Sequence, residues 1–168
     1  MEYTAVTHNF DPLFAPDSRV LILGSIPSPK SRAQKFFYGH PQNRFWPVLA
    51  AVFGEEAPGT VEEKRALALR HHIAMWDTLA SCEIRGASDT SIRNPVPNDL
   101  KWLIDQTKVR AVFCTGATSY KYYCKLCRAQ TGIDAVCLPS TSPANAVWSR
   151  EKLIEAYRVI AEAVEGSI

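Results

Sequence analysis

The chain has 168 residues, of which 46% are hydrophobic and 21% are charged, with a formal net charge of +2. This composition excludes a disordered, collagen-like or low-complexity chain. No apolar run reaches the ~20 residues that a membrane-spanning helix needs, and the first residues lack the features of a signal peptide, so we expect residues 1–168 to form one cytoplasmic domain.

Four short apolar runs predict buried strands, and helical patterns lie between them. The runs that predict strands are 20–24, 73–76, 109–114 and 135–138. Helical spacing covers residues 45–53, and Thr60, Asn98 and Ser149 are each placed to cap a helix that follows. Strands that alternate with helices predict βαβ units and a parallel sheet.

Ligands of such sheets bind beyond the carboxyl ends of the strands, so we searched the loops there for functional residues. Three predicted strands end in polar or small-residue loops, at residues 24–29, 77–78 and 139–146. The first loop, taken alone, is explained by an ordinary turn at the end of a strand. The last loop either connects to the Ser149 cap or forms a backbone-rich surface that grips phosphate.

Residues 36–46 form an unusual segment of five aromatic residues together with a histidine, an asparagine and an arginine. Phe45 falls on the helical stripe and is expected in the core. Asn43 either caps that helix or, with Tyr38 and His40, contributes to a pocket for a planar, hydrogen-bonding ring. The residues themselves leave both interpretations open.

The five cysteines predict reduced thiols, because their number is odd and two lie inside apolar runs. Cys124 and Cys127 have the spacing of half a zinc site, but no second pair completes it. With Tyr120 and Tyr123 they follow the spacing of a buried helical face, so we expect core packing, and no metal or cofactor. The sequence pI of about 8.3 permits nucleic acid as a partner without arguing for it.

The segment GHPQNRFW at residues 39–46, after GSIPS at 24–28, resembles the uracil-DNA glycosylase superfamily. The mismatch-specific uracil/thymine glycosylases carry a similar run. The segment LPSTSPAN at residues 138–145 makes the DNA-deoxyinosine, or hypoxanthine-DNA, glycosylase family the closer match. The three motifs occur in the same order and span nearly the whole chain.

The resemblance implies an α/β/α sandwich around a four-stranded parallel sheet. It also implies hydrolysis of the bond that joins a deaminated base to deoxyribose in double-stranded DNA. Better-known members position water with an Asp or Asn where this chain has Ile26, and often carry a His where it has Leu138. These departures favour hypoxanthine over uracil. In the deoxyinosine family the catalytic amide corresponds to Asn43.

The resemblance and the loop chemistry together give a full set of expected site residues. The expected catalytic residues are Asn43 and His40. The expected residues of the base pocket are Gly24, Ser25, Ile26, Pro27, Tyr38, Gly39 and Asp77. The expected DNA contacts are Ser140, Thr141, Ser142, Pro143, Ala144 and Asn145. In this interpretation Gly39 leaves room for a two-ring base.

Four functions remain as alternatives at this stage. The first is a monomeric DNA-repair glycosylase for hypoxanthine, acting away from any membrane. The second is a uracil or mismatch-thymine glycosylase. The third is a protein that binds a nucleotide in the same pocket without chemistry, and the fourth is a nucleoside hydrolase. The small-residue loop at 140–145 suits a duplex and argues against the fourth.

Overall fold

The computed structural model describes residues 2–86 and 88–166 and contains a four-stranded parallel sheet of order β3-β2-β6-β7. The strands are β2 (Val20–Gly24), β3 (Ile73–Asp77), β6 (Ala111–Thr115) and β7 (Ala135–Leu138). All four predicted strands are therefore confirmed, although β6 begins two residues later and ends one residue later than expected. The order reverses between β2 and β6, which is where such sheets bind ligands.

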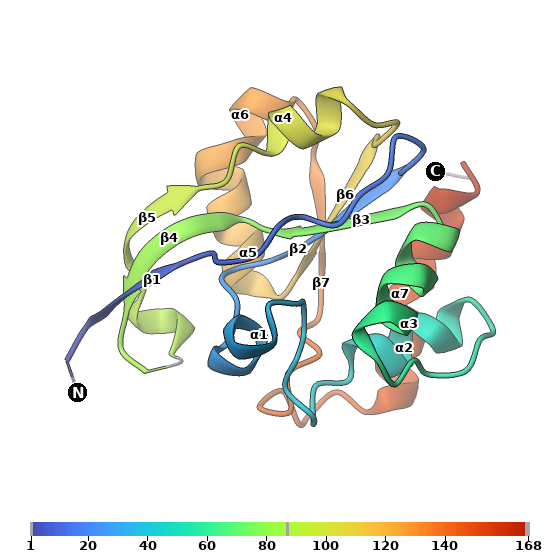
Figure 1. Ribbon diagram of the computed structural model, residues 1–168, viewed down its shortest axis with the longest axis horizontal. Coiled ribbons are helices and arrows are strands. Elements are labelled where there is room, and N and C mark those ends of the chain that lie inside the picture. The colour runs from blue at the N-terminus through green and yellow to red at the C-terminus, as the bar shows by residue number, and fades with distance from the viewer. Residues whose placement is uncertain (1, 87, 167–168) are drawn as a thin grey trace.

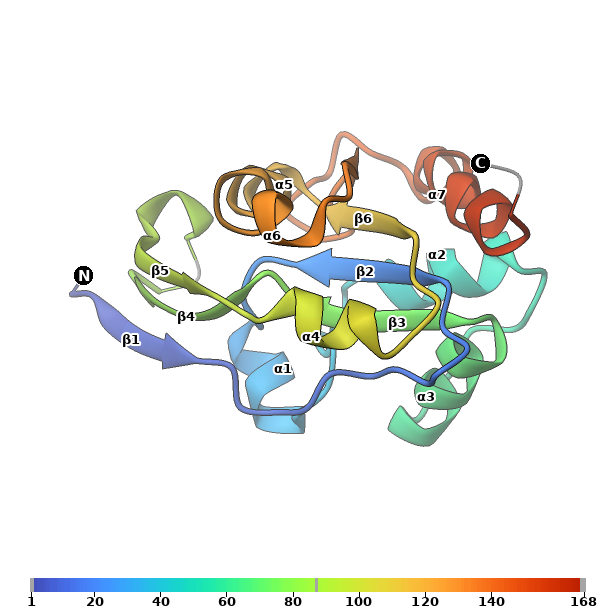
Figure 2. The ribbon, with the colours of Figure 1, turned by 90° about the horizontal axis from the view of Figure 1, so that it is seen from above.

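Helices cover both faces of this sheet, which confirms the predicted three-layer sandwich (Figures 1 and 2). One face packs against α2 (Phe45–Val52), α3 (Val61–Arg70) and α7 (Arg150–Val164). The other face packs against α4 (Leu100–Asp105) and the segment made of α5 (Ala117–Tyr122), a π-helix (Tyr123–Cys127) and α6 (Arg128–Thr131). Consecutive residues of β2 divide between these two cores because strand side chains alternate.

A second, antiparallel sheet of order β1-β4-β5 was not predicted. Its strands are β1 (Thr4–Thr7), β4 (Leu79–Ile84) and β5 (Arg93–Pro97), with a short 3₁₀ helix at Asp89–Ser91 between β4 and β5. Its strands are partly exposed and polar, and two prolines in β5 resemble a turn signal. An edge strand tolerates them because its outer N–H groups need no partner. A short helix, α1 (Pro29–Gln34), was also missed.

Two of the three predicted helix caps are confirmed. Thr60 Oγ1 accepts a hydrogen bond from the Glu63 N–H, and Ser149 Oγ accepts one from the Lys152 N–H. Each hydroxyl satisfies a backbone donor that the first turn of a helix leaves without a partner.

The prediction that Asn98 caps a helix is wrong. Asp99 is the cap of α4, and its carboxylate accepts from the Trp102 N–H. The buried Asn98 side chain instead donates to the carbonyl oxygens of Asp77 and Leu79. The amide of Asn98 has two N–H donors, so it can bond both carbonyl oxygens and join the end of β3 to the start of β4.

The predicted stripe that contains the two neighbouring cysteines is only half buried. Tyr123 and Cys127 lie in the core, whereas Tyr120 and Cys124 are exposed. The π-helix explains this difference, because its wider turn changes which positions share a face. All five thiols are free, and no group of three or more potential metal ligands lies together in residues 2–86 and 88–166. Within the same residues, no helix combines the length and apolar character needed to cross a bilayer.

Candidate active site

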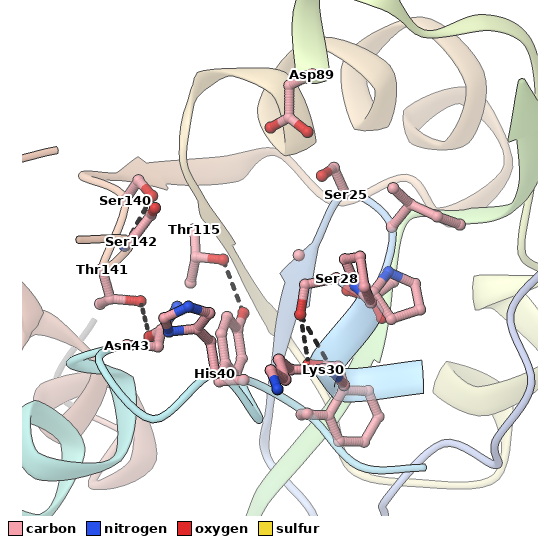
Figure 3. Close-up of a pocket in the computed structure, with 18 of the residues that line it drawn as sticks. Ser25, Ser28, Lys30, His40, Asn43, Asp89, Thr115, Ser140, Thr141 and Ser142 are labelled. Atoms are coloured by element: carbon pink, nitrogen blue, oxygen red, sulfur yellow. Dashed lines mark hydrogen bonds between the residues drawn. The ribbon is translucent and has the colours of Figure 1, made fainter. Parts of the chain in front are cut away.

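A cavity of about 550 Å³ lies at the carboxyl ends of β2, β3 and β6. Its walls are the loop after β2, the segment that leads into α2, and the loop after β7, with residues near the 3₁₀ helix closing one side (Figure 3). These are the loops selected from the sequence. Their meeting at the reversal point of the strand order makes this cavity the candidate active site.

Asp77 is a buried residue of the cavity wall and is held by a residue that sequence reasoning missed. Its Oδ2 is 2.8 Å from His8 Nε2, and the two side chains are only 8% and 4% exposed. Its Oδ1 lies against Gly24, where a Cβ would come within 2.5 Å of that oxygen. Position 24 therefore has to be glycine so that the carboxylate can reach the cavity.

Tyr38 lines the cavity in a tightly held conformation. Its backbone is left-handed, with φ of 53°, which is uncommon for a residue with a side chain. Its ring stacks on Phe45 with centroids 4.0 Å apart, and its hydroxyl lies 2.7 Å from Thr115 Oγ1 (Figure 3). Burial, with a smaller contribution from Asp77, raises the pKa of the Tyr38 hydroxyl. The ring is neutral and rigid.

The side chain of Asn43 faces the cavity with a fixed orientation. Its Oδ1 accepts hydrogen bonds from the Phe45 N–H at 2.9 Å and from Thr141 Oγ1 at 2.8 Å. An amide oxygen has two lone pairs, so both are used and the carbonyl end is identified by its donors. The Nδ2 group donates to no acceptor within the described residues and is left for a ligand. The N-cap of α2 is Arg44, so the expectation that Asn43 caps this helix is wrong; Asn43 precedes the cap, and its Oδ1 accepts from the N–H of Phe45, the first residue of α2. The interpretation of Asn43 as a pocket residue agrees with its place in the cavity wall.

His40 lies beside Asn43 in the cavity wall (Figure 3). Its Nδ1 accepts a hydrogen bond from the Gln42 N–H at 3.1 Å. In the neutral ring this leaves the proton on Nε2. His40 can therefore donate a hydrogen bond to a molecule in the cavity.

The loop after β7 is shaped by its own hydroxyl groups. Ser140 Oγ accepts from the Ser142 N–H, and Ser142 Oγ accepts from the Ala144 N–H. Each serine keeps its O–H hydrogen for an outside acceptor. Pro143 and Ala144 are exposed at the tip of the loop. The Thr141 side chain differs from the expectation, because it is buried and its hydroxyl is committed to Asn43.

Arg44, another residue whose role the sequence did not suggest, fastens this loop to the start of α2. Its guanidinium donates to the carbonyl oxygens of Ser142, Asn145 and Trp148, and its N–H donates to the carbonyl oxygen of Thr141. A planar group with five donors suits three carbonyl acceptors in a way that lysine does not. The segment 39–46 and the loop after β7 are therefore joined into one structural unit.

Two predicted site residues lie outside the cavity wall. The expectation that Gly39 makes room for a base is wrong, because its Cα faces α1, where a Cβ would lie 2.8 Å from Gln34 Oε1. Its missing side chain permits packing instead. Asn145 also lies outside the wall, and its amide donates to the Ser140 carbonyl within the loop.

The remaining predicted residues line the cavity, together with polar residues that were not predicted. Ser25, Ile26 and Pro27 form the wall next to Gly24. The unpredicted polar residues at the wall include Lys30, Arg32, Asp89 and Thr115. Burial raises the pKa of the Asp89 carboxyl, and a hydrogen bond from Thr118 opposes that rise.

Comparison with known proteins agrees with this geometry. The family model described as the uracil DNA glycosylase superfamily matches residues 12–163. The chain belongs to that superfamily. A solution NMR structure of a protein described as a uracil DNA glycosylase, from Methanosarcina acetivorans, is similar with a TM-score of 0.79 and 27% identity. The similarity covers 93% of this chain and 96% of that one.

Two relatives within this superfamily match most of the chain. A protein of Methanosarcina barkeri named hypoxanthine DNA glycosylase is 33% identical over 138 residues, which are 81% of this chain and 86% of the relative. A protein of Methanosarcina acetivorans with the same name is 28% identical over 148 residues, covering 88% of this chain and 93% of the relative. This superfamily member therefore aligns with both relatives over nearly their whole lengths.

Proposed function

We propose that this superfamily member is a DNA glycosylase that removes hypoxanthine from double-stranded DNA by hydrolysing its bond to deoxyribose. The observation that carries the proposal is the fixed amide of Asn43 at the cavity, in a chain that lacks a polar side chain at Ile26 and Leu138. The names of the two relatives support the same base. We further propose that it acts as a cytoplasmic, single-domain monomer.

The substrate nucleotide has to leave the base stack before it can enter this cavity. Flipping costs a few kcal/mol and is easiest at a mispair such as inosine opposite thymine. The exposed Pro143 and Ala144 would press into the gap from the minor groove. The free O–H hydrogens of Ser140 and Ser142 would donate to the flanking phosphates. The loop is held in place for these contacts, because Arg44 donates hydrogen bonds to its carbonyl oxygens from the start of α2.

The extruded base would enter between Tyr38 and the loop after β2. Asp77 Oδ1 would accept the ring N–H, and the backbone N–H groups of Ser25 and Ile26, which have no acceptor within the described residues, would donate to the adjacent carbonyl oxygen. Hypoxanthine presents these two groups side by side. Uracil presents the same pair, which makes a uracil glycosylase the second candidate.

Bond cleavage leaves positive charge on the sugar and negative charge on the base. Because Asn43 Oδ1 is already occupied, its Nδ2 would hold the water by donating to the water oxygen, whose second lone pair points to the anomeric carbon. A positioned nucleophile suffices for a cationic sugar, and the proton that the water loses on forming the C–O bond balances the one that the anionic base takes up. His40 Nε2–H would donate to the departing base. None of these steps uses a metal.

The test of this function compares matched duplexes that carry inosine or uracil opposite thymine or guanine. Single-turnover excision is measured with excess protein and EDTA, by cleaving the product at abasic sites. We expect inosine to be cut fastest. A uracil rate equal to or above the inosine rate would favour the second candidate, and free nucleosides test the hydrolase alternative.

Tyr38→Ala is expected to weaken binding or turnover of an inosine duplex by roughly 5- to 150-fold, since stacking on a base is worth about 1–3 kcal/mol. Tyr38→Phe keeps the ring and its contact with Phe45 but loses the bond to Thr115. We expect it to retain most of the activity. Equal losses in the two variants would assign the effect to the hydroxyl group.

Thr141→Val is expected to lower the excision rate by about 10- to 100-fold, because a small misplacement of a catalytic group has effects of that size. The change keeps the buried volume but removes the donor to Asn43 Oδ1. Duplex affinity should stay within a few fold. Thr131→Val is the control, since it removes a half-buried hydroxyl that contacts Tyr123 and Ile133, and Thr131 does not line the cavity. Equal rates for the two variants would show that Thr141 does not position the amide.

A further inference from the structure

His8 forms a buried pair with Asp77, the residue proposed above to accept the ring N–H of the base, and His8 itself has no part in the steps above. His8 follows β1, and its N–H donates to the carbonyl oxygen of Ala80 in β4. Its ring packs against Phe10 and Phe37, with centroid distances of 4.4 and 6.2 Å. The histidine is therefore held from the unpredicted sheet, and it precedes residues 12–163, the part that matches the superfamily model.

The pair gives the two carboxylate oxygens of Asp77 different roles. Oδ2 is 2.8 Å from His8 Nε2, so an ionised Asp77 receives the proton of that nitrogen in a hydrogen bond. Oδ1 accepts from no donor within residues 2–86 and 88–166. Asp77 lines the cavity, and a Cβ added at Gly24 would meet both Asp77 Oδ1, at 2.5 Å, and the Tyr38 hydroxyl, at 3.5 Å. Within these residues, Oδ1 is therefore the oxygen of Asp77 that is free to accept from a ligand.

We infer that His8 is a positioning residue, which orients Asp77 so that Oδ1 can accept a hydrogen bond from a base in the cavity. We infer also that this pair lets the protein discriminate hypoxanthine from adenine. The inference rests on the proposed function and specifies how its site selects the base. Hypoxanthine carries a hydrogen on N1, which Oδ1 can accept. Adenine carries a lone pair on N1, which faces the same oxygen with repulsion and leaves a buried acceptor without a donor.

Discrimination against adenine is the demanding task for such an enzyme, because adenine is the normal base from which hypoxanthine arises by deamination. Shape cannot achieve it, since the two purines differ only at position 6 and at the N1 proton. The carboxylate of Asp77 has two acceptor oxygens, and the hydrogen bond to His8 fixes one of them, Oδ2, away from the ligand. His8 thereby gives this buried carboxylate a partner and sets the orientation of Oδ1.

Removing the donor of His8 should therefore change selectivity rather than binding alone. Without the hydrogen bond from His8, the Asp77 side chain can turn, and no oxygen is held opposite N1 of the base. Loss of His8 is thus expected to weaken hypoxanthine recognition and to relieve the repulsion of adenine at the same time.

The test measures the affinity of wild type, His8→Phe and His8→Gln for duplexes that hold either 2′-fluoro-2′-deoxyinosine or 2′-fluoro-2′-deoxyadenosine. The 2′-fluoro group slows cleavage, so recognition is measured without chemistry. The opposite position is an abasic analogue in both duplexes, which removes differences in base pairing. Phenylalanine keeps the ring that packs on Phe10 and Phe37, whereas glutamine restores a donor near the position of Nε2.

We expect the hypoxanthine-to-adenine affinity ratio to fall about 10- to 100-fold in His8→Phe and to stay within about threefold of wild type in His8→Gln. His71→Phe is the matched control. The ring of His71 also stacks on a phenylalanine, Phe53, and contacts a carboxylate, that of Glu55. However, His71 lies before β3, at the opposite end of that strand from Asp77. Its ratio should not change.

An unchanged ratio in His8→Phe, even with weaker binding to both duplexes, would overturn the inference, and so would equal ratios in the Phe and Gln variants. If His8→Phe does not fold, Asp77→Asn answers the same question. His8 would then bond the amide oxygen and turn the NH₂ group toward the cavity, so the preference should shift toward adenine. A retained preference for hypoxanthine would overturn the inference.

Failure of the proposed function would look different. If wild type does not excise hypoxanthine from an ordinary inosine duplex, the proposed activity is wrong. If wild type excises it and the variants keep the affinity ratio, the activity stands and the role of the His8–Asp77 pair in selecting the base is wrong.

Discussion

Asn43→Ala is expected to lower the excision rate from an inosine duplex by about 100- to 1,000-fold or more, since removal of a single preorganised donor at a reacting centre has effects of that size. The variant loses the Nδ2 donors that would hold the water, together with the oxygen that Thr141 and the Phe45 N–H contact. Affinity for the duplex should change only a few fold, because the loop at 140–145 makes most of the proposed DNA contacts. Single-turnover excision and gel-shift affinity on one duplex give both quantities.

The control for this prediction has to account for the hydrogen bond that Asn43 Oδ1 accepts from the Phe45 N–H at the start of α2. Loss of such a side-chain bond to the first turn of a helix costs about 1 kcal/mol of stability. Thr60→Ala removes a comparable bond, from the Glu63 N–H at the start of α3, so it should lower the melting temperature by a similar amount and leave the excision rate unchanged. Near wild-type excision by Asn43→Ala would make the catalytic assignment wrong. If Thr60→Ala lowered the excision rate as much as Asn43→Ala does, the loss in Asn43→Ala would be an effect of stability and not of catalysis.

The parallel sheet could be predicted because both of its faces are covered. Residues 20–24 are buried without exception, so that strand appears in the sequence as a continuous apolar run. The antiparallel sheet left no such signal. In β4, buried Leu79, Cys82 and Ile84 alternate irregularly with half-exposed residues, and register shifts break its pairing with β5. This sheet can be recognised only in the folded chain, where β1, from the start of the sequence, pairs with β4.

The same distinction divides the site residues. The loops were found because each follows a predicted strand, and parallel strands end at one edge. Asp77 and Tyr38 were predicted, but the residues that hold them, His8 and Thr115, and the role of Arg44 were missed because their partners are distant in sequence. His8 and Asp77 are 69 positions apart, Arg44 reaches carbonyl groups about 100 positions away, and Tyr38 is joined to Thr115 across 77 positions. Such residues have no local pattern, and only the folded chain shows what they hold.

Gly24→Ala is expected to be the most damaging single-methyl change at the site. Its Cβ would lie 2.5 Å from Asp77 Oδ1, well inside contact distance, and 3.5 Å from the Tyr38 hydroxyl. Asp77 cannot retreat easily, because Oδ2 is bonded to His8 and the two backbones are neighbours in the sheet. Breaking a buried bond of this kind costs about 1–3 kcal/mol, which corresponds to a melting-temperature loss of roughly 2–12 °C in a domain of this size. Excision should fall at least about 100-fold, because the displaced carboxylate and added methyl group both obstruct the base.

A double-mutant cycle separates this clash from a general effect of adding a methyl group. Gly59→Ala is the first control, since its Cβ would meet only Glu63 Oε1 at 3.8 Å, and it should change neither stability nor rate appreciably. In an Asp77→Ala background the carboxylate is gone, so the stability cost of Gly24→Ala should largely disappear. Excision should stay low in that double variant, because the acceptor for the base is also missing. A cost of Gly24→Ala that is equal in both backgrounds would mean that glycine is required there for a reason other than the approach of Asp77.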